Sequence, residues 1–171
     1  AIVFAADINE EDGKAVCADG DGDLRFVHSD VSDTTSIKAL MDHAAAETGG
    51  IDTVFNNAAA GGARPPIHEI EPDEWDRSMD LILRSVAFGI RYAVPHMIGR
   101  PSTQDGTASF INVSSVAAVG PGYSPTAYAV AKCGVLHLNK CAAADLVQFG
   151  IRVTAVQPGF INTNIFTASL E

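Results

Sequence analysis

Three polar side chains in the second half of the sequence have types and spacing suited to proton transfer. Tyr128 and Lys132 are four residues apart, so on a helix their side chains lie on one face, one turn apart. An ammonium group beside a phenol favours the phenolate, so a tyrosine with an ordinary pKa of about 10 becomes a base closer to neutral pH. Ser115, thirteen residues earlier, could hold a substrate oxygen by a hydrogen bond. A Tyr-x-x-x-Lys pair alone is more often an amphipathic surface pair, so the neighbouring sequence has to decide.

The segments around these side chains predict how they are positioned. Residues 108–113 form an apolar, strand-like run that leads directly to Ser115. A loop rich in glycine and proline follows, and apolar spacing then predicts a helix over 126–149 and a strand over 151–156. The end of a strand and the start of a helix would therefore bring the three side chains to one place.

The first hundred residues alternate strand-like and helix-like segments. Continuous apolar runs predict buried strands, and apolar residues at helical spacing predict helices. The expected strands cover 1–6, 24–28 and 51–55, and the expected helices cover 34–47 and 73–98. Residues 99–106 are polar, and we expect them to form a mobile surface loop.

Four motifs stand out, in this order: Asn56-Asn57-Ala58-Ala59, Ile111-Asn112-Val113-Ser114-Ser115, Tyr128-Ala129-Val130-Ala131-Lys132 and the segment 157–163. In order and spacing they resemble the classical short-chain dehydrogenase/reductase (SDR) family. The resemblance implies an α/β fold with a three-layer, Rossmann-like, doubly wound parallel sheet, and a single partial NAD(P)-binding domain over 1–171. It also implies an oxidoreductase that transfers a hydride between NAD(H) and a secondary alcohol or ketone, on a small ring or a hydroxysteroid-like body.

The resemblance assigns roles to the three polar side chains. Tyr128, as phenolate, takes the substrate hydroxyl proton while hydride leaves for C4 of the nicotinamide. Lys132 lowers the pKa of the tyrosine and binds the nicotinamide ribose, and Ser115 steadies the substrate oxygen. The implied cofactor contacts, besides Tyr128 and Lys132, are Asp7, Asp30, Val31, Asn57, Ala58, Ala59, Pro158, Gly159, Ile161 and Thr163. No metal site is predicted, because the histidines lack ligand spacing.

The first apolar run ends on an acidic residue, Asp7. At the end of the second strand of a dinucleotide-binding unit, such a carboxylate accepts hydrogen bonds from the adenosine ribose and repels a 2′-phosphate. Asp7 therefore favours NAD over NADP. The alternative is an ordinary helix N-cap, and without the resemblance the two interpretations are equally good.

Two positions depart from the family pattern. Ala59 stands where the family has a glycine, which the chain tolerates if φ is below zero there. Ile82 stands where the family usually has an asparagine thought to help relay protons from the active-site lysine. If the relay uses a main-chain carbonyl and a water, a weakened activity survives; if it needs the amide, turnover is in doubt. The alternative function is therefore a non-catalytic remnant or assembly domain of an SDR-like protein with impaired cofactor binding.

The Gly-x-x-x-Gly-x-Gly turn that carries the pyrophosphate in this family does not occur in the sequence. In the strand order 3-2-1-4-5-6, the strand before that turn lies in the middle of the sheet. We therefore expect the strands at 1–6 and 51–55 each to have an unpaired edge. We interpret the chain as an internal piece of a longer chain, which alone binds cofactor weakly and has low stability.

Composition and charge limit the partners. Lys and Arg total 11 against 21 Asp and Glu, a formal net charge of −10, which excludes a general affinity for nucleic acid or anionic lipid. No apolar run has membrane-spanning length, and three cysteines without Cys-x-x-Cys spacing fit a reducing, cytoplasmic location. The resemblance implies a homo-oligomer, dimer or tetramer, through the helices 73–98 and 126–149. A serine hydrolase is a poor alternative, because no Gly-x-Ser-x-Gly elbow exists.

Overall fold

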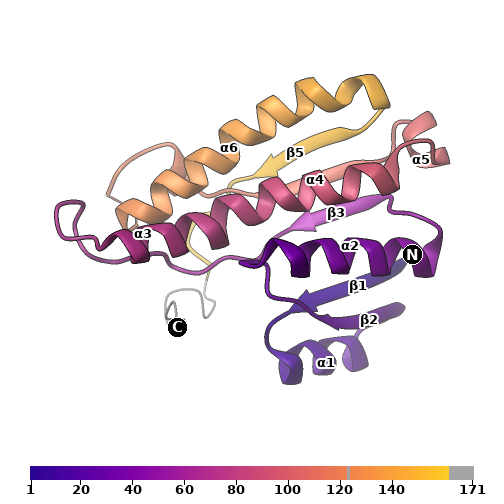
Figure 1. The fold of residues 1–171 in the computed structure, drawn as a ribbon, viewed down its shortest axis with the longest axis horizontal. Helices are drawn as coiled ribbons and strands as arrows, with labels where there is room; N and C mark the ends of the chain where they lie inside the picture. The colour runs from indigo at the N-terminus through magenta and orange to yellow at the C-terminus, as the bar shows by residue number, and fades with distance from the viewer. Residues whose placement is uncertain (123, 162–171) are drawn as a thin grey trace.

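Strands and helices alternate along the chain in the computed structural model, which describes residues 1–122 and 124–161 (Figure 1). The strands are β1 (Ile2–Asp7), β2 (Asp23–His28), β3 (Thr53–Asn56), β4 (Ser109–Val113) and β5 (Arg152–Val156). The α-helices are α1 (Glu10–Asp19), α2 (Thr34–Thr48), α3 (Pro72–Met79), α4 (Ser85–Met97), α5 (Pro101–Gln104) and α6 (Thr126–Leu146). A π-helical segment (Asp80–Arg84) joins α3 to α4, and 3-10 turns lie at Val116–Ala118 and Val147–Phe149. No helix in these ranges combines the length and apolarity needed to span a bilayer.

All strand pairs are parallel and fall into two sheets. β1 pairs with β2, and β3, β4 and β5 form the second sheet in that order. Within the described residues, β1 and β3 each pair on one edge only, which confirms the expected unpaired edges. Val3 on β1 and Phe55 on β3 are 48% and 59% exposed, so apolar side chains are left uncovered on both strands.

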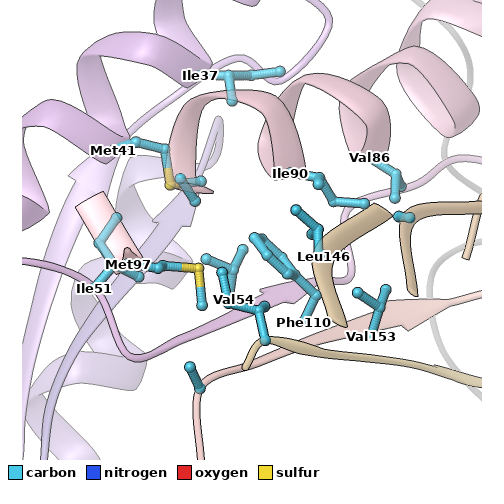
Figure 2. Packing of buried hydrophobic residues seen from close by; sticks show 14 of the residues in the cluster. Ile37, Met41, Ile51, Val54, Val86, Ile90, Met97, Phe110, Leu146 and Val153 are labelled. Atoms are coloured by element: carbon cyan, nitrogen blue, oxygen red, sulfur yellow. The ribbon is translucent and has the colours of Figure 1, made fainter. Parts of the chain in front are cut away.

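Helices cover the sheets, and α2, α4 and α6 share one hydrophobic core with β3, β4 and β5. α1 packs on β1 and β2, α2 packs beside α4, and α6 packs on β4 and β5 (Figure 1). Figure 2 shows the ring of Phe110 on β4 among Val54, Ile90 and Leu146, which come from β3, α4 and α6. Phe110 is fully buried, so the strand that leads to Ser115 and the helix that carries Tyr128 are fixed to the same core.

Residues 99–106 are not the polar surface loop that their composition predicted. Pro101–Gln104 form helix α5, and Ser102 is buried. The Ser102 hydroxyl donates to Asp52 Oδ1 at 2.6 Å, and Arg100 Nε donates to the same oxygen at 2.9 Å. Arg100 first and Ser102 second hold the pKa of the Asp52 carboxyl below its usual range. This polar segment is therefore fixed in place, because the Asp52 carboxylate accepts the hydrogen bonds of its side chains.

Gly150 ends the helical region after α6, and we expect its replacement to be costly. It has a φ of 70°, and a Cβ built there would lie 2.1 Å from the carbonyl oxygen of Thr103. Gly150→Ala should lower the free energy of unfolding by about 2–4 kcal/mol, from left-handed strain and the displaced backbone together. Gly106→Ala is the matched control, because Gly106 has a φ of 75° and no heavy atom within 4 Å of its ideal Cβ. Urea unfolding measures both variants, and equal losses would contradict the steric part of this account.

Candidate active site

Ser115 lies just beyond the end of β4, where the chain turns into a 3-10 segment. It is 8% exposed and is the N-cap of the turn Val116–Ala118. Its Oγ accepts a hydrogen bond from the Ala117 N–H at 3.1 Å. Because the oxygen accepts this bond, the hydroxyl hydrogen remains able to donate to another oxygen.

Tyr128 and Lys132 lie on the first turns of α6, as their spacing predicted. The helix begins at Thr126, directly after Pro125, whose extended backbone suits a helix start. Tyr128 is half-buried and Lys132 is 2% exposed. The Nζ atom of Lys132 lies 5.7 Å from the centroid of the Tyr128 ring. The phenol and the amine therefore lie on one face of the helix, the amine deeper in the protein.

The surroundings of Lys132 set its charge. Its Nζ donates to the main-chain carbonyl of Val113 at 2.7 Å, and its own carbonyl accepts a bond from Ser114 Oγ at 2.8 Å. Burial lowers the pKa of Lys132 to about 8. The side chain is therefore still mainly an ammonium at neutral pH, but it loses its proton far more readily than an exposed lysine.

A small hollow joins two of the three predicted catalytic side chains. Its volume is about 40 Å³, and it is lined by Ser115, Val116, Ala117, Ser124, Tyr128, Gly159 and Phe160. The hollow thus brings together the end of β4, the start of α6 and the segment after β5. Lys132 does not line it and lies one helical turn behind Tyr128.

The segment after β5 closes one side of this hollow. The main-chain N–H of Val116 donates to the Pro158 carbonyl at 3.1 Å, which holds this segment against the 3-10 turn. Among the described residues, no heavy atom lies within 4 Å of the ideal Cβ of Gly159. Ile161 is exposed, and Thr163 lies outside the described residues.

Asp7 and Asp30 lie at or just beyond the carboxyl ends of β1 and β2. Asp7 is exposed, and its Oδ1 accepts from the main-chain N–H of Asn9 at 2.9 Å. The N-cap of α1 is Asn9, so the alternative interpretation of Asp7 as a helix cap is wrong. Asp30 Oδ1 accepts from the Ser32 N–H at 2.8 Å, and the cap of α2 is Asp33. Val31, beside Asp30, is half-buried against the core.

The predicted cofactor residues Asn57, Ala58 and Ala59 follow β3 directly, at the edge of the sheet where β4 leads to Ser115. Asn57 and Ala58 are exposed, and Ala59 is half-buried. No described residue other than glycine has a positive φ, so the methyl group of Ala59 meets no left-handed strain.

The loop after β3 contacts Tyr128 in a way that the sequence did not indicate. Gly62 has a φ of 74°, and its ideal Cβ would lie 3.1 Å from the Tyr128 nitrogen. The next N–H, of Ala63, donates to Ser78 Oγ at 2.9 Å, and that hydroxyl donates to the Glu74 carbonyl at 2.7 Å. Ser78 lies on α3 and is fully buried, so its hydroxyl fixes this loop against α3. The only sequence signal was the pair Gly61-Gly62.

The helix predicted over 73–98 contains one irregular turn, at the position of the unusual isoleucine. Figure 1 shows α3 and α4 as one nearly continuous rod, and Asp80–Arg84 within it is π-helical. Ile82 lies in this turn and is 0% exposed. Leu83 of the same turn packs close to α6, because the ideal Cβ of Gly134 would lie 2.8 Å from Leu83 Cδ2. π-helical turns are frequent at functional sites. The π turn therefore points to the region around Ile82 as functional, independently of the sequence motif.

Solved structures with this architecture are short-chain dehydrogenases and reductases. The levodione reductase structure matches with a TM-score of 0.85 and 27% identity, over 96% of this chain and 64% of that one. A short-chain dehydrogenase from Mycobacterium smegmatis matches with a TM-score of 0.82 and 31% identity, over 93% of this chain and 66% of that one. The fold is therefore the α/β fold with parallel sheets that these proteins have, of which this chain covers part.

The sequence comparisons define the family. A family model described as enoyl-(acyl carrier protein) reductase matches residues 1–171. Cis-4-hydroxycyclohexanecarboxylate dehydrogenase of Sinomonas cyclohexanicum is 36% identical over 166 residues, 95% of this chain and 64% of that protein. (+)-Borneol dehydrogenase 2 of Salvia officinalis is 35% identical over 173 residues, 99% of this chain and 59% of that protein. The chain belongs to the SDR family, and it spans less than two thirds of the length of these two relatives.

Proposed function

We propose that this chain is part of a dinucleotide-binding domain of an oxidoreductase, which interconverts a secondary alcohol and a ketone with Tyr128 as the acid–base residue. The observation that carries the proposal is the hollow lined by Ser115 and Tyr128, with the Lys132 amine one turn behind the phenol. Proton transfer needs a titratable group and a hydrogen-bond donor within reach of one substrate oxygen. Tyr128 is the titratable side chain in the lining, and Ser115 is the proposed donor, since the hydroxyl of Ser124, which also lines the hollow, donates to the Pro125 carbonyl.

In the oxidising direction, each of the three residues has one task. Tyr128 takes the hydroxyl proton, and the Ser115 hydroxyl donates to the substrate oxygen as a carbonyl forms. The Lys132 ammonium stabilises the phenolate by its charge. A bound nicotinamide supplies the hydride acceptor. The remaining residues position the alcohol and exclude water from the hollow.

We infer that the cofactor is NAD(H) rather than NADP(H). The exposed carboxylate of Asp7 at the carboxyl end of β1 can accept hydrogen bonds from ribose hydroxyls and would repel a phosphate on that ribose. Asp30, Val31 and Asn57 to Ala59 would line the adenosine side. Gly159 lines the Tyr128 hollow, and Pro158 and Ile161 beside it would border a nicotinamide there; Thr163, the further predicted contact, lies outside the described residues.

The names of the relatives support a ring alcohol as substrate. Their printed substrates are a hydroxycyclohexanecarboxylate, borneol and, in a Mycobacterium bovis relative 34% identical over 163 residues, a hydroxysteroid. All three are alicyclic alcohols, with the hydroxyl on the ring in the first two and at position 3 or 20 in the third. We therefore propose an alicyclic secondary alcohol, or the corresponding ketone, as the substrate class.

The test uses this chain and an extended chain that carries a first strand and glycine turn of the family at its N-terminus. NADH and NADPH binding are measured by fluorescence titration, and turnover is measured with cyclic ketones and with crotonyl-CoA. The proposal predicts tighter NADH than NADPH binding and reduction of ketones. Reduction of crotonyl-CoA alone would instead favour the enoyl reduction that the name of the family model suggests.

The competing function is a non-catalytic remnant or assembly domain, and Ile82 is the feature that supports it. An apolar side chain with no exposed surface can neither donate nor accept a proton. If the extended chain binds NADH and reduces no ketone, Ile82→Asn is the decisive variant. Ketone reduction that appears only with the asparagine would show that the relay needs the amide and that the natural chain is inactive.

We also propose that two copies associate through the face formed by α4 and α6. A groove of about 330 Å³ lies between these helices, with Ile90, Val94, Leu138 and Leu146 in its lining. Arg91 and Asp145, both exposed, also line it and carry opposite charges. Because a two-fold interface pairs each patch with its own copy, Arg91 of one subunit can meet Asp145 of the other twice.

Charge reversal tests this association. Arg91→Asp and Asp145→Arg should each weaken dimerisation by about tenfold or more, because like charges then meet at two places in the interface. The double variant restores opposite charges and should recover the dimer. Light scattering after size exclusion measures all three, and two single variants that remain dimeric would place the interface elsewhere.

The location that we propose is the cytoplasm. Cys17, Cys133 and Cys141 are free thiols, two of them exposed, which fits a reducing compartment.

A further inference from the structure

Three asparagine side chains form a continuous row across the second sheet and onto α6. Asn56 Nδ2 at the end of β3 donates to Asn112 Oδ1 on β4 at 2.8 Å. Asn112 Nδ2 donates to Asn139 Oδ1 on α6 at 3.0 Å, and Asn139 Nδ2 donates to the Val153 carbonyl on β5 at 3.3 Å. Every amide donates in the same direction, so the row runs from β3 through β4 to α6 and ends on the backbone of β5.

The centre of the row lies in the interior of the protein, and its two outer members, Asn56 and Asn139, are half-buried. Asn112 is 0% exposed, and no described buried side-chain nitrogen or oxygen lacks a hydrogen-bond partner. A Cβ on Gly89 of α4 would lie 2.5 Å from Asn56 Oδ1, so a glycine there leaves room for the first amide. A buried amide without its partner costs about 1–3 kcal/mol, so each member of the row depends on the next.

Stability alone does not require such a row. Replacing both partners of a buried hydrogen bond with apolar groups of the same shape can be nearly neutral. Amide hydrogen bonds are directional, because the donor and the acceptor must face each other. Apolar contacts are not directional, so two elements joined by them alone can slide past each other. The row therefore constrains how far α6 can move along β4.

The same helix and strand are also joined at the active-site end. Ser114 Oγ donates to the Lys132 carbonyl at 2.8 Å, and Lys132 Nζ donates to the Val113 carbonyl at 2.7 Å. Asn139 follows Lys132 by seven residues, or about 10 Å along the helix axis, and lies on the same face. Two sets of hydrogen bonds, at Lys132 and at Asn139, therefore join α6 to β4 about two turns apart and fix the position of the helix along the strand, that is, its axial register.

We propose that Asn139, acting through Asn112, is a positioning residue that sets this register and so holds Lys132 Nζ on the Val113 carbonyl. The inference rests on the proposed function in so far as Lys132 is the catalytic lysine. Without Asn139, α6 can slide or rotate against β4, and the Lys132 amine then leaves its buried position. The phenol of Tyr128 on the same helix loses its fixed placement relative to Ser115 on the strand.

The test follows the lysine side chains by NMR, because the chain has four of them: Lys14, Lys38, Lys132 and Lys140. In the 171-residue chain, one signal should titrate near a pKa of about 8, and its loss in Lys132→Met assigns it. In Asn139→Leu that titration should move up toward the ordinary lysine pKa of about 10.4, while the other three signals keep theirs. Asn139→Ser is the second variant for the case that leucine prevents folding, because its hydroxyl is too short to reach Asn112.

Val135→Ala is the matched control. Val135 is 0% exposed on α6, one turn before Asn139, and makes no polar side-chain contact. It should destabilise the chain and leave Lys132 titrating near its original value. The proposal is overturned if the Lys132 titration stays unchanged in folded Asn139 variants, or if it moves as far in Val135→Ala. Because this readout needs neither cofactor nor turnover, its failure and the failure of the proposed dehydrogenase function are separate results.

Discussion

Tyr128→Phe should lower ketone turnover in the extended chain by about 10²–10⁴-fold, the range expected when a general acid–base group is removed. Phenylalanine keeps the ring that packs at the start of α6 and removes only the hydroxyl that exchanges the proton. NADH binding should therefore remain within about twofold, since loss of a group that acts on the reacting atoms affects turnover rather than binding. The measurement is kcat, together with the fluorescence titration.

Tyr92→Phe is the matched control for this prediction. Tyr92 is half-buried on α4, where its ring packs against Phe88 at a centroid distance of 5.6 Å. Loss of its hydroxyl should leave turnover unchanged. Equal losses in the two variants, or full turnover in Tyr128→Phe, would remove Tyr128 from the mechanism.

Lys132→Met should abolish most turnover and at the same time stabilise the protein at neutral pH. The native pKa of Lys132 is about 8, whereas an unfolded lysine titrates near 10.4. Below pH 8 both states bind the proton, so the native state carries the full cost of a buried ammonium. The pKa difference corresponds to about 3 kcal/mol, of which about 1 kcal/mol is offset because the variant leaves the Val113 carbonyl without its donor.

The pH dependence gives the sign of this effect. Between pH 8 and 10.4 the unfolded state binds more protons than the native state, so the stability of the natural chain rises with pH. The advantage of Lys132→Met, about 2 kcal/mol at pH 7, should shrink across that interval. Urea unfolding at a series of pH values measures it, with Lys140→Met as the exposed control. A variant that is less stable than the natural chain at pH 7 would contradict the burial cost assigned to Lys132.

Elements with strong apolar periodicity were predictable from the sequence, and weakly patterned ones were not. The helices at 34–47 and 126–149 and the parallel strands have their predicted places. The apolar residues of both helices and of β3, β4 and β5 face one core. Helix α1 was missed, because Gly13 interrupts it and no side chain in it is buried. A Cβ on Gly13 would lie 2.2 Å from the Phe26 ring, so close packing on β2 requires this glycine.

The candidate site also contains features that the sequence predicts and features that it does not. Tyr128 and Lys132 were predictable as a pair, because their relation depends only on the period of one helix. The asparagine row was not predictable, because Asn56 and Asn112 are 56 residues apart and meet only in the register that pairs β3 with β4. The π turn at Ile82 and the anchoring of Ala63 by Ser78 also depend on tertiary contacts.

The most direct test of the central claim follows a hydride from cofactor to product. The extended chain is incubated with NADH deuterated at C4 and a cyclohexanone, and the product is analysed by mass spectrometry and NMR. The account predicts cyclohexanol with deuterium on the carbinol carbon, formed about 10²–10⁴-fold more slowly when Tyr128 is phenylalanine. Tight NADH binding with no labelled alcohol from any ring ketone, with Ile82 or with asparagine in its place, would contradict it and leave the non-catalytic function.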